Sequence, residues 1–389
     1  MHRDLIKLGE AATYINGYAF KPDDRGKVGL PIIRIQDLTG NSYDLGFYDG
    51  DYPEKIEIND GDVLISWSAS LGVYIWNNGK ALLNQHIFKV VFDKVNIDKN
   101  YFVYAVRYKL DEMGRKTHGA TMKHIVKRDF DATEIPYPSK HEQIEIANNL
   151  KRIENIIELR SNELQLLDEL IKARFVEMFE NEIEYNKVKL EEIADIVSGI
   201  TKGRKTKCGE LREVPYMAVS NVKDGYIDWT TVKTILATED EIIQYKLLPD
   251  DVLMTEGGDP DKLGRGAIIS LPPKDCIHQN HIFRVRLDET QILPRYFAAY
   301  LQSSQAKTYF LRAAKQTTGI ASINMSQLRG LPTIVPPIEL QLKYSLFSEQ
   351  VDKSKLLSLI KLLEQLITYL YNIFIIYRQD KGEEVEDHE

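Results

Sequence analysis

The clearest pattern in this sequence is a stripe of apolar residues that recurs at helical spacing in two separate segments. In the first segment the apolar positions follow steps of three and four, with one interruption at Arg160. Such steps place side chains on one face of an α-helix. We therefore predict a long helix at 141–182. Its stripe consists of Ile146, Leu150, Ile153, Ile157, Leu164, Leu167 and Ile171.

The second segment, 338–380, has a stricter pattern. Its apolar positions alternate steps of four and three, which is the spacing of a coiled-coil seam. They are Leu356, Ile360, Leu363, Ile367, Leu370 and Phe374, followed by Tyr377. A helix of roughly 40 residues spans about 60 Å. Because neither stripe can remain in water, we expect the two helices to pair, and to be antiparallel if the blocks before them lie at opposite ends.

The apolar residues of the second segment could alternatively form a membrane span. Lys361, Glu364 and Gln365 interrupt the stretch near its middle. A charged residue at the centre of a span costs roughly 3 kcal/mol. We therefore expect no membrane insertion.

The two parts of the chain that precede these helices repeat each other. The shift between matching segments grows in one direction, from 182 to 200 positions, as expected if loops were inserted into a shared scaffold. The matches are Lys7-Leu8-Gly9-Glu10 with Lys189-Leu190-Glu191-Glu192, Gly61-Asp62-Val63-Leu64 with Asp250-Asp251-Val252-Leu253, Asn84-Gln85-His86-Ile87-Phe88 with Gln279-Asn280-His281-Ile282-Phe283, and Ile135-Pro136 with Val335-Pro336. We predict two similar domains, 1–140 and 183–337, and an acidic tail at 381–389.

Each predicted domain mixes short strands with helices. Segments 62–66 and 87–92, and their counterparts 251–255 and 282–287, have the β-branched and aromatic content of strands. The apolar period predicts helices at 101–110 and 296–313. Because regular alternation of strand and helix is missing, an α+β fold is favoured over a parallel α/β sheet.

The charge distribution separates the helices from the domains. The chain carries a formal net charge of −8. Residues 1–140 and 187–337 contribute 0 and +2, whereas 141–186 and 338–389 contribute −6 and −4. The acidity therefore belongs to the helices and the tail, and the balanced domains can form local basic patches.

The two cysteines and the start of the chain indicate a compartment. Cys208 and Cys276 are too few for a disulfide framework, which favours a reducing environment. The first seven residues contain no apolar stretch of signal-peptide length. We expect a cytoplasmic protein.

Polar loops and basic clusters are the candidate nucleic-acid contacts. The loops 66–72 and 255–265 follow equivalent strands but differ in chemistry, as expected if one scaffold reads two targets. Basic groups could neutralise phosphates, although clusters of charge are more often solvated faces. The candidates are Arg34, Ser66, Ser68, Ser70, Arg115, Lys116, Lys123, Lys127, Arg128, Lys202, Arg204, Lys205, Lys207, Lys262, Arg265, Arg312 and Lys315.

Signs of catalytic or cofactor chemistry are weak. No phosphate-binding loop and no dinucleotide fingerprint is present. His86 and His281 precede matching strands, and His278 lies close to His281, but no Cys-x-x-Cys pattern accompanies them. We interpret these histidines as holding loops, and predict neither catalytic residues nor metal ligands.

The order of domain, helix, domain and helix resembles the specificity subunit of a type I restriction-modification enzyme. The resemblance covers nearly the whole chain. It rests on the two openings and the two Gly/Asp-Asp-Val-Leu segments quoted above, and on the closings that lead into each helix. These are Ile135-Pro136-Tyr137-Pro138 before Glu142-Gln143, and Pro336-Pro337-Ile338-Glu339 before Gln341. One departure is Leu340, which stands where the first copy has Glu142.

The resemblance implies a non-catalytic subunit that recognises a bipartite, asymmetric target in double-stranded DNA. Each domain would read one half-site, and the paired helices would set the spacer and dock two methyltransferase subunits. Those partners would carry S-adenosylmethionine and methylate adenine. Two further restriction subunits would use ATP and Mg²⁺ for translocation and cleavage. The alternative left open by the residues is a scaffold whose two domains bind peptides or other proteins.

Overall fold

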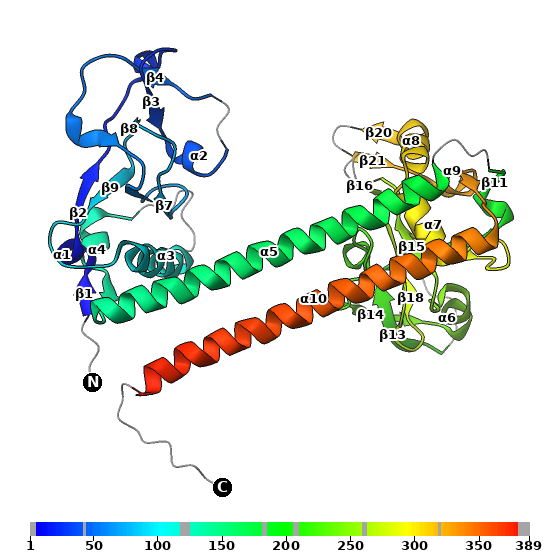
Figure 1. Ribbon diagram of the computed structural model, residues 1–389. Helices are drawn as coiled ribbons and strands as arrows, with labels where there is room; N and C mark the ends of the chain where they lie inside the picture. Colours follow the sequence, from blue (N-terminus) through cyan, green and yellow to red (C-terminus); the bar gives the residue numbers. More distant parts are fainter. Residues whose placement is uncertain are drawn as a thin grey trace, which may run out of the picture. The chain divides into compact units, whose positions relative to one another are not determined.

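A computed structural model describes residues 5–41, 44–116, 125–180, 185–204, 210–258, 263–317 and 320–379; side chains at 111, 112, 114–116, 316, 317, 320 and 370–379 are not described. The described chain forms two compact units. Unit 1 comprises Met1–Leu159 and Leu362–Glu389, and unit 2 comprises Arg160–Lys361. Figure 1 shows that each unit contains a globular part and stretches of the two long helices. The predicted tail 381–389 lies outside the described residues.

Unit 1 is built on two four-stranded sheets. One has the order β2-β9-β6-β7 and the other β4-β3-β8-β5, while β1 and β10 form a separate antiparallel pair. The strands are β1 (Leu5–Lys7), β2 (Thr13–Asn16), β3 (Leu30–Ile33), β4 (Phe47–Tyr48), β5 (Glu57–Ile58), β6 (Val63–Ser66), β7 (Gly72–Ile75), β8 (Ala81–Leu83), β9 (Ile87–Val91) and β10 (Glu134–Pro136). The helices are α1 (Leu8–Ala11), η1 (Pro22–Asp24), α2 (Ile35–Leu38), η2 (Glu54–Ile56), α3 (Lys99–Lys116), α4 (Lys127–Asp131) and α5 (Lys140–Phe179).

Unit 2 repeats this plan with additions. The sheet β12-β19-β15-β17 corresponds to β2-β9-β6-β7, and the pair β11-β22 corresponds to β1-β10. Its strands are β11 (Lys187–Lys189), β12 (Ala194–Ser198), β13 (Arg212–Met217), β14 (Lys233–Ala237), β15 (Val252–Thr255), β16 (Gly257–Gly258), β17 (Gly266–Ile268), β18 (Ile277–His278), β19 (Ile282–Leu287), β20 (Lys315–Thr317), β21 (Ile320–Ser322) and β22 (Pro332–Ile334). Its helices are η3 (Leu190–Glu192), η4 (Val219–Asn221), α6 (Glu239–Tyr245), α7 (Pro294–Leu301), α8 (Ser304–Ala313), α9 (Met325–Arg329) and α10 (Ile338–Gln379).

One of the two inner strands of each main sheet, β6 in unit 1 and β15 in unit 2, is buried on both faces. In β6, Val63 and Ile65 point into one core cluster, while Leu64 points into another. Successive residues of a strand face opposite sides, so one short strand supplies both clusters. The equivalent strand β15 divides Val252 and Leu253 between two clusters in the same way. The α+β architecture with an internal repeat is confirmed.

The repeated Gly/Asp-Asp motif forms the same turn in both units. Gly61 has φ +87° and Asp250 has φ +68°, and both donate their backbone N–H across the turn, to Trp76 O at 2.7 Å and Ile269 O at 2.8 Å. The following aspartate closes the turn, because Asp62 and Asp251 each accept a backbone N–H from three residues upstream at 2.8 and 2.7 Å. The motif therefore marks a left-handed backbone position that admits Gly or Asp.

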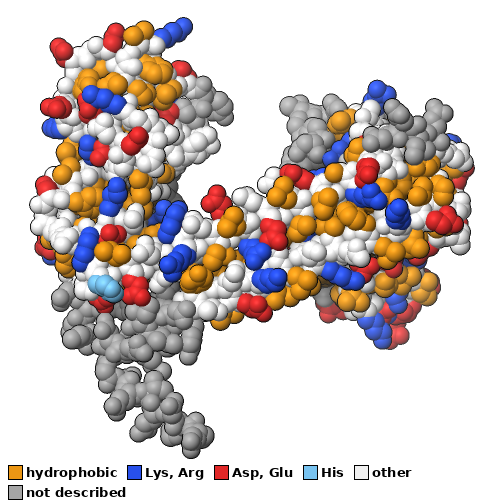
Figure 2. Space-filling view, viewed as in Figure 1, with side chains coloured by type: hydrophobic (Ala, Val, Ile, Leu, Met, Phe, Trp, Pro, Cys, Tyr) orange, Lys and Arg blue, Asp and Glu red, His pale blue; other side chains and the backbone are white. Residues whose placement is uncertain are grey.

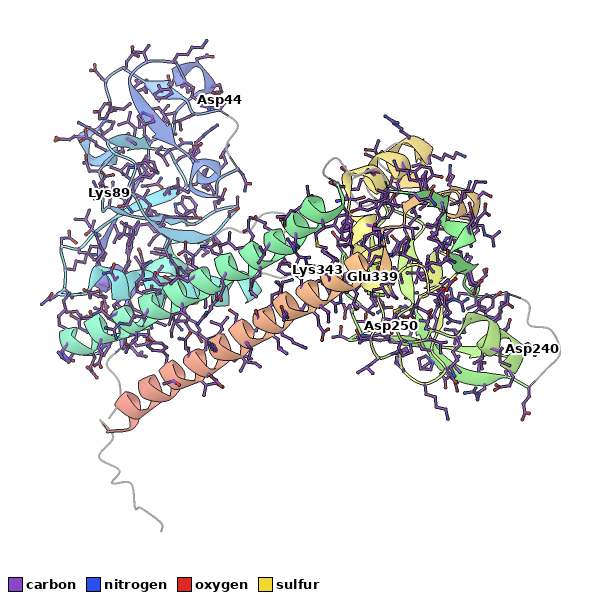
Figure 3. The ribbon with its side chains drawn as sticks, turned by 45° about the vertical axis from the view of Figure 1, so that its right-hand side comes forward. Asp44, Lys89, Asp240, Asp250, Glu339 and Lys343 are labelled. Atoms are coloured by element: carbon purple, nitrogen blue, oxygen red, sulfur yellow. The ribbon has the colours of Figure 1, made fainter. Side chains whose placement is uncertain are left out.

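A cation on the neighbouring strand neutralises the aspartate of each turn. Lys89, labelled in Figure 3, lies 2.9 Å from Asp62 and also donates to the carbonyl oxygen of Glu57 at 2.7 Å. In unit 2, Arg286 makes a two-pronged contact with Asp251 at 2.7 and 2.8 Å. Both turns are thus tied to the central sheet by a charge-assisted bond.

Each long helix is joined to its domain by a buried glutamine near its start. Gln143 accepts a hydrogen bond from the Asp98 N–H at 2.7 Å and donates to Pro138 O at 2.8 Å. Gln341 accepts from the Leu293 N–H at 2.8 Å and donates to Pro336 O at 2.8 Å. The side chains are 1% and 0% exposed. We define these two arrangements as the glutamine joints.

The residue before each glutamine differs between the two copies, with Glu142 in the first and Leu340 in the second. Glu142 accepts a hydrogen bond from the backbone N–H of Ser139 at 2.7 Å, and so caps the start of α5. Leu340 has no side-chain acceptor for such a cap. The glutamine makes the joint in both copies, whereas the cap is specific to the first.

Within unit 2, the end of α5 pairs with the beginning of α10. Ser358 donates to Glu163 at 2.8 Å, Lys355 lies 2.5 Å from Asp168, and Tyr344 packs on Phe179 with ring centroids 5.7 Å apart. Residue numbers rise along α5 as they fall along α10, so the helices are antiparallel, as predicted.

Four of the six predicted seam positions on α10 were wrong. Leu356, Ile360, Leu363 and Ile367 are 42 to 65% exposed, whereas Tyr344, Ser348, Val351 and Ser358 are buried. Leu370 and Phe374 belong to the stretch whose side chains are not described. The pattern misled because α10 is apolar on more than one face, and the most regular stripe is not the packed one. On α5, Ile157 is 43% exposed, while the other six predicted positions are half-buried.

The helix predicted at 296–313 is two helices. The α7 helix ends at Leu301, and Ser303 begins α8 by accepting a hydrogen bond from the Ala306 N–H at 3.2 Å. This serine cap interrupts the apolar period without a proline or glycine to mark the break.

Candidate nucleic-acid interface

The loops after β6 and β15 start from the same backbone arrangement. The Trp67 N–H donates to His86 O at 3.2 Å, and its carbonyl accepts from the Ile125 N–H at 3.0 Å. The Glu256 N–H donates to His281 O at 3.0 Å, and its carbonyl accepts from the Ile323 N–H at 2.9 Å. These two matched sets of bonds fix Trp67 and Glu256 at equivalent positions. We call this pair of backbone bonds, one to a histidine and one from an isoleucine, the His–Ile anchor.

In unit 1 the His–Ile anchor holds a residue of an aromatic cluster. Trp67 stacks on Phe88 with centroids 5.5 Å apart and an interplanar angle of 21°. The His86 ring packs edge-on against Trp67, with centroids 4.9 Å apart. The indole N–H donates to Asn16 Oδ1 at 3.3 Å. His86 has φ +71°, and its Nδ1 is buried with no hydrogen-bond partner among the described residues. A histidine held in this unfavourable backbone region is part of a constrained site.

A small cavity opens beside Trp67. Its volume is about 280 Å³, and it is lined by Tyr14, Asn16, Trp67, Phe88, Val126 and Lys127. The Lys127 ammonium lies 5.8 and 5.9 Å from the ring centroids of Tyr14 and Phe88, within range of a cation–π interaction. The wall is aromatic, and a positive charge stands at its rim.

In unit 2 the same position is charged. His281 Nδ1 lies 2.6 Å from Glu256 Oε2, and the Asn280 amide lies 3.4 Å from His281 Nε2. The side chains of His281 and Glu256 are 55% and 37% exposed. A neutral imidazole can donate from Nδ1 while accepting from the amide at Nε2, so this chain of bonds orients the carboxylate at the surface.

Two predicted arginine contacts are engaged within their own domain. Arg34 Nε lies 3.2 Å from Asp37, and its Nη2 also bonds the carbonyl oxygen of Asp44. Arg204 pairs with Glu241 through two bonds of 2.7 and 2.5 Å, and this guanidinium lowers the pKa of the Glu241 carboxyl. We therefore assign both arginines to loop structure.

The remaining basic candidates differ in how they are presented. Lys127 contacts Asp131 at 2.6 Å, while the Arg128 side chain is 89% exposed and lies 3.3 Å from Asp129. Exposed cations at Lys202, Arg312 and Lys315, and a half-buried one at Arg265, lie in unit 2. Lys123, Lys205, Lys207 and Lys262 lie outside the described residues, and only the backbone of Arg115 and Lys116 is described.

The three predicted serines have different roles. Ser66 is 0% and Ser68 is 6% exposed, and the Ser66 hydroxyl donates to Ser70 O at 2.6 Å. Their burial corrects the prediction that they contact DNA, because they shape the loop from inside. Ser70 is exposed. The sequence did not single out Trp67, Asn16 or Glu256; aligning the first residue after β6 and β15 would have revealed the contrast.

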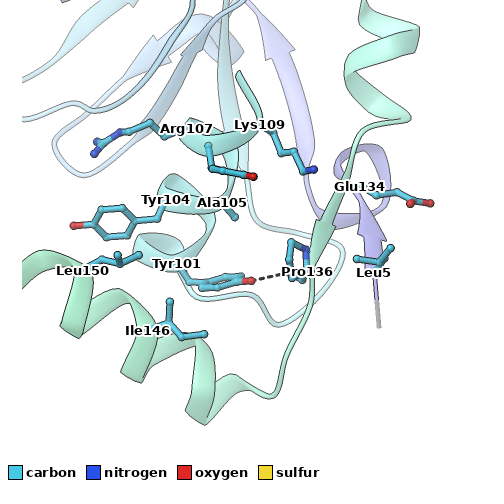
Figure 4. A pocket seen from close by; sticks show the side chains of 11 residues that line it. Leu5, Tyr101, Tyr104, Ala105, Arg107, Lys109, Glu134, Pro136, Ile146 and Leu150 are labelled. Atoms are coloured by element: carbon cyan, nitrogen blue, oxygen red, sulfur yellow. Dashed lines mark hydrogen bonds between the residues drawn. The ribbon is translucent and has the colours of Figure 1, made fainter. Parts of the chain in front are cut away.

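The starts of the two long helices differ in how they are covered. In unit 1, a pocket of about 590 Å³ lies between α3, β10 and α5, lined by Tyr101, Tyr104, Tyr108, Ile146, Leu150 and neighbouring residues (Figure 4). The Tyr101 hydroxyl donates to Pro136 O at 2.8 Å beside it. In unit 2 the equivalent Tyr296 donates to Ile334 O at 3.1 Å, and Phe175 and Phe179 fill the groove at 5.7 and 4.9 Å from its ring.

Apolar side chains are also exposed along the long helices, as Figure 2 shows. On α10, Leu356, Leu357, Leu359 and Ile360 are 42 to 58% exposed, and on α5 Leu159 and Leu166 are 68% and 64% exposed. Where exposed apolar residues form a patch, they mark sites of protein association.

Within the described ranges, no group of three or more His, Cys, Asp or Glu side chains could hold a metal ion. His278 and His281 are three residues apart but lie in different environments, because His278 is buried and His281 is exposed. Among the described residues, no helix is long and apolar enough to span a membrane.

Comparison with known proteins identifies the family. The model of the type I restriction modification DNA specificity domain matches residues 4–169 and again residues 182–367. The chain therefore belongs to the family of type I restriction-modification DNA specificity proteins. It is a specificity subunit with two DNA-recognition domains, and subunits of this kind are non-catalytic.

Curated relatives carry the same description. The chain is 24% identical over 374 residues to the type I restriction enzyme EcoBI specificity subunit of Escherichia coli, an alignment that covers 86% of this chain and 76% of that one. It is 27% identical over 213 residues to the MjaVIII specificity subunit of Methanocaldococcus jannaschii, covering 50% of this chain and 49% of that one.

Solved structures share the fold. The type I restriction-modification S subunit from M. genitalium has a TM-score of 0.55 at 14% identity, covering 94% of this chain and 93% of that chain. A second structure, from work on complex assembly and conformational transition of the type I R-M system, has a TM-score of 0.58 at 15% identity, covering 95% and 94%.

Proposed function

We propose that this specificity subunit recognises a bipartite, asymmetric sequence in double-stranded DNA, with one half-site read by each domain. The observation that carries the proposal is the His–Ile anchor, because one backbone arrangement presents Trp67 in the first domain and Glu256 in the second. A repeated scaffold with different side chains at one position is suited to reading two different half-sites.

The proposal extends to the helices as a spacer. A helix of 40 residues such as α5 is about 60 Å long, which corresponds to roughly 18 base pairs at 3.4 Å each. Lengthening both helices together by one turn should then lengthen the unread gap while both half-sites stay the same. An unchanged gap in such a variant would refute the spacer.

The exposed apolar residues of α5 and α10 support docking of two methyltransferase subunits, since a surface of leucines and isoleucines is costly to leave in water. In this proposal those subunits carry S-adenosylmethionine and methylate adenine. Two restriction subunits join the assembly through them and use ATP and Mg²⁺. We place the whole assembly in the cytoplasm.

The test is to co-express the chain with its methyltransferase in a host that lacks DNA methylation, and to map N6-methyladenine across the genome. A single split motif with a constant gap is the expected result. Exchange of residues 1–140 should change one half of that motif only. A stable complex without methylation would instead favour the alternative of a scaffold whose domains bind other proteins.

A further inference from the structure

We infer that Trp67 and Glu256 are the equivalent positions at which the two domains distinguish bases, with Trp67 contacting a thymine methyl group and Glu256 accepting from a cytosine amino group. This inference rests on the proposed function. It adds which residues read, and which base each one favours.

The first step is the equivalence of the two positions. Each residue is held by one backbone bond to the carbonyl of a histidine and one from the N–H of an isoleucine, at 3.2 and 3.0 Å for Trp67 and at 3.0 and 2.9 Å for Glu256. The neighbouring Phe88 and Phe283 are the same residue type, as are His86 and His281. The His–Ile anchor is therefore the same in both domains, and only the side chain that it presents differs.

The second step is the chemistry of Trp67. Phe88 supports the ring from behind, and the indole N–H is directed to Asn16. The ring also lines the cavity of about 280 Å³, so it presents an apolar surface to that cavity. In the major groove, the thymine methyl is the apolar group that such a surface can recognise. Lys127, whose side chain is 55% exposed at the cavity rim, is placed to attract a phosphate.

The third step is the chemistry of Glu256. Its Oε2 is fixed by His281, and the His281 ring is in turn contacted by the Asn280 amide. A carboxylate is an acceptor only, and the cytosine N4 amino group is the donor that a carboxylate accepts from in the major groove. The fixed orientation reduces the entropy lost when the base is bound.

The test maps methylation by the complete complex carrying Trp67→Ala or Glu256→Gln. Each change should relax one base of one half-site and leave the other half-site unchanged. One base contact discriminates by about 1–3 kcal/mol, which corresponds to roughly a 5- to 150-fold preference. Val28→Ala and Leu271→Ala, at positions 69% and 84% exposed, are matched controls that should leave the motif unchanged.

Binding to synthetic duplexes provides the second readout, and it also covers a variant that no longer supports methylation. Replacing the relevant thymine by uracil removes only the methyl group, so it should weaken binding by the wild type and not by Trp67→Ala. Equal sensitivity of both proteins to that replacement would overturn the assignment of Trp67. Unaltered discrimination at every base in Glu256→Gln would overturn the assignment of Glu256. A wild type without any split motif would refute the proposed function itself.

Discussion

The two domains of this chain share a backbone arrangement and differ in what fills it. The Gly/Asp-Asp turn, the His–Ile anchor and the glutamine joint recur with hydrogen bonds of nearly the same length. At three equivalent places the contents differ: Trp67 against Glu256, the open pocket of unit 1 against the groove filled by Phe179, and Leu83 against His278. Backbone bonds thus preserve the fold, and side chains are left to change.

The largest expected effect separates the filled groove from the open pocket. Phe179 is 1% exposed and contacts Tyr296 and Tyr344, so Phe179→Ala should destabilise the chain by about 3–5 kcal/mol. Leu150→Ala removes a half-buried side chain from the pocket wall in unit 1 and should cost about 1 kcal/mol. Denaturant unfolding of the full chain measures both, and equal losses would contradict the comparison.

The second prediction concerns acid. Burial lowers the pKa of His278 to about 4, and its ring lies between the carbonyls of Tyr245 and Val197. The unfolded chain then binds the proton more readily, so stability is present above the ordinary pKa of about 6.5 and is lost as pH falls toward 4. The loss is on the order of 3 kcal/mol.

Unit 1 supplies the control for this titration, because Leu83 occupies the equivalent buried place. His278→Leu should be less stable at pH 7, since two carbonyls lose a neighbour, but its stability should change less between pH 6.5 and 4. Thermal unfolding across that range tests the prediction. An unchanged pH dependence would assign the acid sensitivity to other groups.

The third prediction tests whether the glutamine joints are equivalent. Gln143→Ala removes the side-chain partner of the Asp98 N–H and the Pro138 carbonyl, and Gln341→Ala removes that of the Leu293 N–H and of the Pro336 and Gln291 carbonyls. Each change leaves partly or fully buried backbone groups without this partner and should cost about 2–3 kcal/mol. Gln→Glu at either position would keep the acceptor and lose the donor. A much larger loss at one joint than at the other would show that the two are not equivalent.

The smallest effects belong to the left-handed turn. Gly61→Val should cost about 1–3 kcal/mol, because a β-branched residue is strained at φ +87°. Asp250→Gly should change stability by less than about 1 kcal/mol, since relief of strain is offset by the greater freedom of glycine in the unfolded chain. Unfolding midpoints of the two variants measure this difference.

The sequence predicted the repeat, the long helices and the main strands because these depend on periodicity and on order along the chain. It mistook the exposed Leu356, Ile360, Leu363 and Ile367 for the packed seam, since regular spacing does not reveal which of two apolar faces is buried. It could not show that Arg34 and Arg204 are held by acidic neighbours. Nor could it place Trp67 opposite Glu256, because that requires the register of loops of different lengths.

The glutamine joints have a consequence for how such proteins change over generations. Each joint uses one glutamine side chain and two or three backbone groups of the domain that precedes it, so a foreign domain that ends in the same way would fit the helix without further adjustment. A single crossover between two genes at the codons around Gln143 would therefore produce a folded hybrid in one step. Inheritance can then combine half-specificities as whole segments, without passing through a series of damaged intermediates.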